Sequence, residues 1–167
     1  MDEARLGQQG TLTKVWAPRG SRPTIVRQTR YEWVYLYAAV EPAAGESVAL
    51  LAPNVNTDTF NVFLGMPAAE VKPDEHVVLI MDQAGWHKSR ALALPESVTV
   101  PLLPPYSPEP NPVERLWHFP RSHHLSNRAY EDHDHLIDAG TAAWRTLTPQ
   151  TIKSVCRCPY LERASQG

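Results

Sequence analysis

Residues 77–90 of the chain read VVLIMDQAGWHKSR, and this stretch decides the class of fold. Five apolar residues, Val77–Met81, have the profile of a strand buried on both faces, and Asp82 follows them directly. In α/β sheets, ligands bind beyond the carboxyl ends of buried strands. Asp82 therefore stands where a functional side chain is expected, although an Asp at this position also serves to cap a following helix.

The second informative stretch, residues 103–117, reads LPPYSPEPNPVERLW. Asn111 is a favourable N-cap, Pro112 suits the first helical position, and Glu114 falls at the third. The pattern resembles a capping box, so one interpretation is that Glu114 only stabilises its own helix. The proline-rich approach favours the other interpretation, in which a rigid segment aims the Glu114 carboxylate at a site.

Around these two stretches, the sequence predicts strands first and alternating strands and helices afterwards. The predicted strands are Thr11–Trp16, Thr24–Gln28, Trp33–Val40, Ser47–Ala52, Val77–Met81 and Val98–Leu103. The predicted helices are Thr57–Val71, Trp86–Leu94, one from Pro112, Ala129–Leu147 and Pro149–Cys156. The first two strands read as a hairpin, and the whole order indicates a mixed α/β sheet flanked by helices.

Length and charge set limits on the possible functions. With 167 residues, 43% of them hydrophobic, the chain is long enough for one domain with its own core. No run of about 18 apolar residues is present, so no membrane span is predicted. Residues 1–30 hold six Lys and Arg against two acids, in a chain of net charge −2. Arg19 and Arg22 in this segment are candidate contacts for DNA phosphates, with a solvated hairpin as the alternative.

The two motifs together carry a resemblance to a known family. Val78–Arg90 with Leu103–Trp117 closely resembles the insertion-sequence-630 family of bacterial transposases, in the mariner-like group of DDE superfamily endonucleases. The likeness extends to Asp2–Gly7 (DEARLG), which is similar to the segment that holds the family's first catalytic aspartate. The resemblance implies a ribonuclease-H-like fold and a catalytic, metal-binding triad of Asp2, Asp82 and Glu114.

The resemblance also implies a cofactor, partners and a place of action. Three carboxylates suit two Mg²⁺ ions about 4 Å apart, with Mn²⁺ able to substitute, for phosphodiester cleavage and strand transfer. The implied partners are DNA, as transposon terminal repeats and target, and a second copy of the chain in a homodimer. The implied location is the bacterial cytoplasm, at the nucleoid. His87 and Lys88, close to Asp82, are further candidate DNA contacts, with polar residues that only face solvent as the alternative.

The resemblance implies that residues 1–167 form a single catalytic domain, without the helix-turn-helix region and the start of the first strand that precede it in the family. Asp2 follows only Met1, so we expect its attachment to the sheet to be one-sided. Pro67 and Pro120 fall inside predicted helices and should interrupt them. These departures give a second hypothesis, a truncated, non-catalytic remnant that only folds, binds DNA or dimerises. A third is a stand-alone nuclease with the same metal site.

Overall fold

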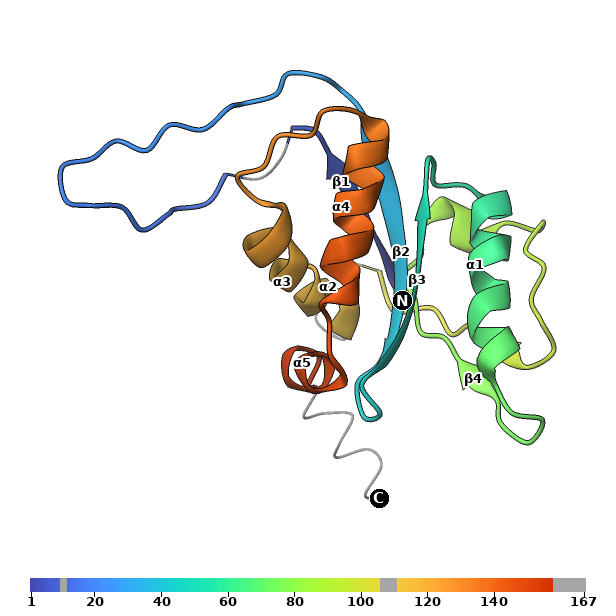
Figure 1. The fold of residues 1–167 in the computed structure, drawn as a ribbon. Coiled ribbons are helices and arrows are strands. Elements are labelled where there is room, and N and C mark those ends of the chain that lie inside the picture. Colours follow the sequence, from blue (N-terminus) through green and yellow to red (C-terminus); the bar gives the residue numbers. More distant parts are fainter. Residues whose placement is uncertain (10–11, 106–110, 158–167) are drawn as a thin grey trace.

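The computed structural model describes residues 1–9, 12–105 and 111–157, which form a sheet with helices on both of its faces (Figure 1). Three strands make an antiparallel meander in the order β1–β2–β3. They are β1 (Asp2–Gly7), β2 (Trp33–Glu41) and β3 (Glu46–Ala52). The last two confirm predicted strands, and β1 is paired with β2 along its whole length, from Asp2 opposite Ala38 to Gly7 opposite Trp33.

Two shorter strands continue the layer on the other side of β1. Strands β4 (Val77–Val78) and β5 (Val98–Thr99) pair in parallel, and a parallel bridge between Met81 and Leu102 extends the pairing. The backbone nitrogen of Met1 donates to the Ile80 carbonyl at 2.6 Å, which places this segment next to β1. The mixed sheet expected from the sequence is therefore present, with both predicted strands in shorter form.

The helices are α1 (Thr57–Glu70), α2 (Pro112–Leu116), α3 (His118–Pro120), α4 (His133–Arg145) and α5 (Pro149–Val155), with a 3-10 turn η1 (Gly85–Lys88) and a π-helical turn η2 (Arg121–Leu125). Helix α1 covers one face of the sheet, and α2 and α4 cover the other (Figure 1). Because side chains alternate along a strand, β2 and β3 contribute residues to both cores, whereas β1 contributes Ala4 and Leu6 to the core on the α4 side. Leu6 and Val34 belong to the α4 side, whereas Tyr37 packs with Phe60 and Phe63 of α1.

Local capping decides where several helices begin. The Asn56 side chain accepts from the backbone nitrogen of Thr59, which confirms the predicted start of α1. Helix α4 starts later than predicted, because Asp132 caps it by accepting from His135 at 2.8 Å. The predicted helix over Trp86–Leu94 is wrong in extent, since only the turn η1 forms.

The predicted hairpin between residues 11 and 28 is not formed by strands. Residues 12–32 run out from the body and return without helix or strand, around a turn in which Ser21 donates to the Pro18 carbonyl (Figure 1). Pro18 and Pro23 lack the backbone N–H groups that a two-stranded ladder needs. We call residues 12–32 the arm. Its base is fastened by bonds from Thr13 to Asn127 and from Gln28 to Tyr130.

The two prolines inside predicted helices have different consequences. Helix α1 runs through Pro67 to Glu70, so the expectation that Pro67 interrupts it is wrong. Pro67 lies in the last turn, where it removes a single helical bond. Near Pro120 the helix opened by Glu114 is broken into α2, α3 and η2, and α2 ends at Leu116. That is the residue whose carbonyl a proline four positions later displaces.

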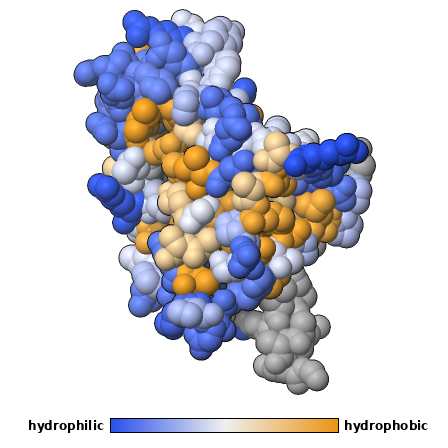
Figure 2. Space-filling model, turned by 90° about the vertical axis from the view of Figure 1, so that its right-hand side faces the viewer, coloured by the Kyte–Doolittle hydropathy of each residue, from blue (hydrophilic) through white to orange (hydrophobic). Residues whose placement is uncertain are grey.

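The face of the molecule on the α1 side is unusually apolar. Figure 2 shows hydrophobic atoms gathering across its centre. Val62 in α1 and Val78 in β4 are 63% and 61% exposed, and Leu94 is 46% exposed. Across the described ranges, no helix combines the length and the apolar character needed to cross a membrane.

Candidate active site

The pleat of β1 sends its first two side chains to opposite faces of the sheet. Ala4 and Leu6, which share a face with Asp2, pack with Val113 and Trp117 on the α2 side. Glu3 lies opposite Tyr37, which belongs to the core on the α1 side. Neighbouring carboxylates therefore enter different surroundings.

Met1 joins the three segments that carry the predicted carboxylates. Its nitrogen donates to the Ile80 carbonyl, two residues before Asp82. Its carbonyl accepts from the side-chain nitrogen of Asn111 at 3.2 Å, and Asn111 is the N-cap of α2. The start of β1, the strand end before Asp82 and the start of the Glu114 helix thus meet at one residue.

The Asp2 carboxylate lies half-buried on the α2 side. Its Oδ2 accepts a hydrogen bond of 2.7 Å from the indole nitrogen of Trp117. Burial raises the pKa of Asp2 from the usual 3.8 to about 7, and the charge of Glu114 adds to the rise, while the Trp117 hydrogen bond opposes it. The Glu114 carboxylate therefore lies close enough to affect the ionisation of Asp2.

Helix α2 holds Glu114 at its exposed first turn. The Asn111 side chain accepts from the backbone nitrogen of Val113, as expected of an N-cap. Val113, Leu116 and Trp117 are buried and seat the helix on the sheet. Glu114 itself is exposed, on the turn whose backbone N–H groups favour negative charge.

Asp82 follows the Met81–Leu102 bridge and has one fixed oxygen. Its Oδ1 accepts from the backbone nitrogen of Ala84 at 2.9 Å and lies 2.8 Å from Nδ1 of His87. Among the described residues, no hydrogen bond is made to Oδ2, and the side chain is 56% exposed. Asp82 does not cap η1, whose N-cap position is Ala84 without a side-chain cap bond; it closes a tight turn before it, and its second oxygen is exposed.

His87 lies in the interior, between two carboxylates. Its side chain is 1% exposed, and Nε2 is 2.9 Å from Oε1 of Glu3, which is 8% exposed. Burial lowers the pKa of His87, but the hydrogen bonds and charges of Glu3 and Asp82 outweigh it and raise the pKa above its usual value. Both ring nitrogens of His87 are engaged within the protein, away from the surface where a DNA phosphate would lie.

Among residues 1–9, 12–105 and 111–157, no three His, Cys, Asp or Glu side chains stand close enough to form a ready-made metal site. What the fold brings together is the Asp2–Glu114 pair and, through Met1, the segment of Asp82. Hard carboxylate oxygens are the ligands that Mg²⁺ prefers. A carboxylate whose pKa is raised by burial, and further by a second carboxylate nearby, is a chemical setting that a divalent cation fits.

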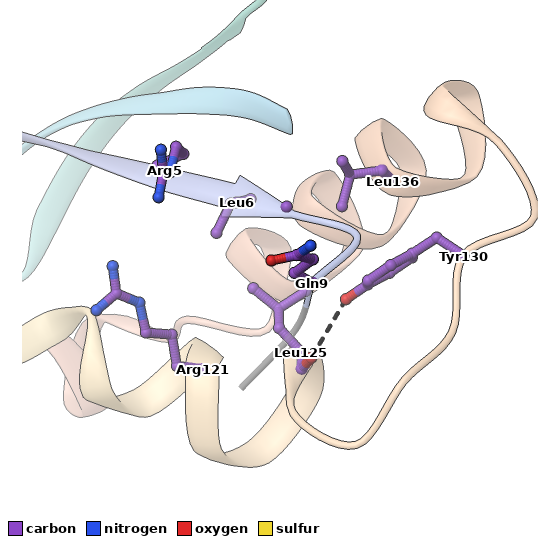
Figure 3. Close-up of a pocket in the computed structure, with 8 residues that line it drawn as sticks. Arg5, Leu6, Gln9, Arg121, Leu125, Tyr130 and Leu136 are labelled. Atoms are coloured by element: carbon purple, nitrogen blue, oxygen red, sulfur yellow. Dashed lines mark hydrogen bonds between the residues drawn. The ribbon is translucent and has the colours of Figure 1, made fainter. Parts of the chain in front are cut away.

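The predicted DNA contacts lie in three different settings. Arg19 and Arg22 are exposed near the tip of the arm, and Lys88 is exposed at the end of η1, next to the buried His87. The sequence analysis did not single out a further pair of arginines beside a cavity of about 70 Å³ at the far end of β1. Arg5 and Arg121 lie on one side of it, and Tyr130 on the other (Figure 3).

A ribonuclease-H-like α/β domain with acidic residues on β1, after β4 and on α2 is the class of protein that these features define, and comparison with known proteins agrees. The chain matches the DDE superfamily endonuclease family over residues 1–137. It therefore belongs to that family, which is consistent with the resemblance to the insertion-sequence-630 transposases.

Known relatives extend the comparison. The uncharacterized protein y4pE/y4sA of Sinorhizobium fredii (strain NBRC 101917 / NGR234) is 40% identical over 121 residues, which cover 72% of this chain and 90% of the relative. The crystal structure of the Mos1 mariner paired end complex with Mn matches with a TM-score of 0.67 and 15% identity, over 93% of this chain and 50% of that one. The Mos1 Strand Transfer Complex matches with a TM-score of 0.59 and 16% identity, over 92% and 48%. These likenesses confirm the ribonuclease-H-like fold, and the chain spans about half the length of the Mos1 chains.

Proposed function

We propose that the chain is the catalytic domain of a cut-and-paste DNA transposase, with Asp2, Asp82 and Glu114 as its metal ligands. The observation that carries the proposal is the junction at Met1, to which the segments of all three carboxylates are bonded. The family assignment supports the chemistry, and the Mos1 complexes support DNA as the substrate. A DNA substrate would place the protein in the cytoplasm, at the nucleoid.

Each of the three residues has a distinct part in the proposed site. Two Mg²⁺ ions, when bound, supply the charge that favours attack on a phosphodiester and departure of the leaving oxygen. Asp2 would hold metal in its ionised form, which the hydrogen bond from Trp117 favours. Asp82 presents its open oxygen, and Glu114 projects from the exposed first turn of α2. Mn²⁺ is the expected substitute, because it also favours oxygen ligands.

The proposed DNA contacts lie outside the carboxylate set. Arg19 and Arg22 on the exposed arm, with Lys88 beside the site, would bind phosphates of the transposon ends or the target. Two DNA ends must be handled together during transposition, so we propose a homodimer as the active form.

The test is cleavage of a supercoiled plasmid that carries the gene with its flanking chromosomal DNA, in the presence of Mg²⁺. We expect excision of the element and joined products with the full chain, and neither with Asp82→Asn. Asp74→Asn is the matched control, because Asp74 is exposed and precedes β4, whereas Asp82 follows the strand. Binding without cleavage by the unaltered chain would identify the non-catalytic remnant, and nicks without joined products would identify a nuclease.

A further inference from the structure

Glu3 is a fourth acidic residue close to the proposed ligands, and the mechanism above does not use it. It follows Asp2 directly but points to the α1 side of the sheet, where its side chain is 8% exposed. Its Oε1 accepts from the indole nitrogen of Trp86 at 3.2 Å and lies 2.9 Å from Nε2 of His87. A carboxylate buried at this depth costs free energy unless it is paired, so its position needs a compensating partner.

His87 is that partner, and it contacts a carboxylate through each ring nitrogen. Nε2 faces Glu3 and Nδ1 faces Asp82, both at hydrogen-bond distance from carboxylate oxygens. Phe60 packs on the ring with a centroid distance of 4.6 Å. The result is a hydrogen-bonded row of three side chains through the interior.

The row ends on the oxygen of Asp82 that is already fixed. His87 and the backbone nitrogen of Ala84 both bind Oδ1, so the carboxylate cannot rotate freely and its other oxygen is held toward the open side. Glu3 stands next to Asp2 on β1, so the same row ties the Asp82 loop to the strand that carries the first proposed ligand.

We propose that Glu3 and His87 are positioning residues, which aim Asp82 and fix its placement relative to Asp2 without binding metal themselves. The inference rests on the proposed metal site. Groups of this kind behind metal ligands typically change metal affinity about 10–100-fold when removed. His87 thereby acts through Asp82 rather than as a contact to DNA.

The test is Mn²⁺ affinity of the full chain, measured by electron paramagnetic resonance of free Mn²⁺, with paired substitutions at His87. The amide nitrogen of His87→Asn occupies the place of Nδ1 and keeps the donor to Asp82. The amide nitrogen of His87→Gln occupies the place of Nε2, so the donor to Asp82 is lost. We expect about 10–100-fold weaker Mn²⁺ binding for His87→Gln and a loss under about 5-fold for His87→Asn.

Glu3 provides an independent pair. Glu3→Met removes the acceptor at similar volume and loses the same Glu3–His87 contact as His87→Asn, so it should weaken Mn²⁺ binding to a similar degree, up to about 5-fold, whereas Glu3→Gln keeps an acceptor oxygen and should weaken it less. His76→Asn and Glu70→Gln, at exposed positions, are the matched controls. Thermal unfolding shows whether each variant is folded. If the variants at one of the two positions do not fold, those at the other position still test the proposal.

The outcomes separate this inference from the function on which it rests. Equal effects of His87→Asn and His87→Gln, or no effect of His87→Gln and Glu3→Met, would overturn the positioning role while leaving the metal site intact. An unaltered chain that binds no Mn²⁺ would overturn the metal site as well.

Discussion

Asp2 and Glu3 are neighbours with the same kind of side chain, and the two faces of the sheet give them opposite properties. Asp2 shares its face with Glu114, and its pKa is raised to about 7 because burial and a like charge both oppose ionisation. Glu3 shares its face with His87, whose ring nitrogens form hydrogen bonds with the carboxylates of Glu3 and Asp82. Asp2 therefore has a like charge nearby, whereas Glu3 has a hydrogen-bonding partner in His87.

The difference shows how one strand can separate two tasks. Glu3 is paired with His87, which suits it to holding a loop, whereas Asp2 has the Glu114 carboxylate nearby, which suits it to taking up a cation. The pleat provides both environments at successive positions without any change in the backbone. Each carboxylate even has its own indole donor, Trp117 for Asp2 at 2.7 Å and Trp86 for Glu3 at 3.2 Å.

The largest effect should come from neutralising each carboxylate in turn. Asp2→Asn should lower the rate of plasmid cleavage about 10³-fold, because losing a metal ligand removes several kcal/mol of charge stabilisation. Glu3→Gln, which keeps acceptors for Trp86 and His87, should lower it about tenfold or less. Single-turnover cleavage with saturating Mg²⁺ measures both. Equal losses for the two variants would remove the distinction between ligand and positioning residue.

The next effect concerns stability and pH. Between the usual pKa of 3.8 and the folded value of about 7, the native state holds a proton on Asp2 that the unfolded chain releases. This contribution to stability is present below pH 4 and is lost as the pH rises to 7. Asp2→Asn has no such loss, so its melting temperature should rise relative to the unaltered protein by several degrees between pH 4 and pH 8.

Two controls bear on that pH effect. Asp74→Asn should show a constant difference in melting temperature over the same range, because Asp74 is exposed. At pH 8, Mg²⁺ should raise the melting temperature of the unaltered chain above that of Asp2→Asn, because a bound cation favours the ionised Asp2 carboxylate. A difference between Asp2→Asn and the unaltered chain that does not change with pH would show that Asp2 is ionised throughout.

Sequence rules predicted the structure correctly where neighbouring residues determine it. Asn56 and Asn111 cap the predicted helices, and the apolar run after Trp33 forms the central strand. Sequence rules failed where the structure depends on residues far away in the chain. The segments of the arm have strand-forming residues but find no partner to pair with. Side-chain preferences for strands are realised only against a neighbouring strand.

The same limit applies to the candidate site. Asp82 and Glu114 stand out because a strand end and a capped helix start are readable from adjacent residues, and their role as ligands stays a prediction. The contact between Glu3 and His87 joins positions 84 residues apart. It depends on which face of β1 each residue takes and on the placement of β1 beside the Asp82 segment. The motif pointed to His87 through its nearness to Asp82 in sequence, but it did not indicate burial.

The two indole donors allow a finer comparison. Trp117→Phe removes the hydrogen bond that favours the ionised form of Asp2, so the pKa of Asp2 should rise further. The midpoint of the pH-dependent change in melting temperature should move up by about one pH unit. Trp86→Phe leaves Glu3 bonded to His87 and should cost about 1 kcal/mol, or roughly 2–4 °C, with no such movement. A shifted midpoint in Trp86→Phe would mean that the two faces are not independent.

The smallest effect should come from the arm, which lies apart from both carboxylates. Arg19→Ala and Arg22→Ala should leave the melting temperature unchanged, because both side chains are exposed. If each contacts a phosphate, each substitution should lower the slope of log Kd against log salt by about one, uniformly across duplex sequences. Fluorescence anisotropy at several salt concentrations measures that slope, and Arg145→Ala, at the end of α4, is the matched control. Slopes that match the control would assign DNA binding to surfaces nearer the carboxylates, where Lys88 is an exposed cation to test next.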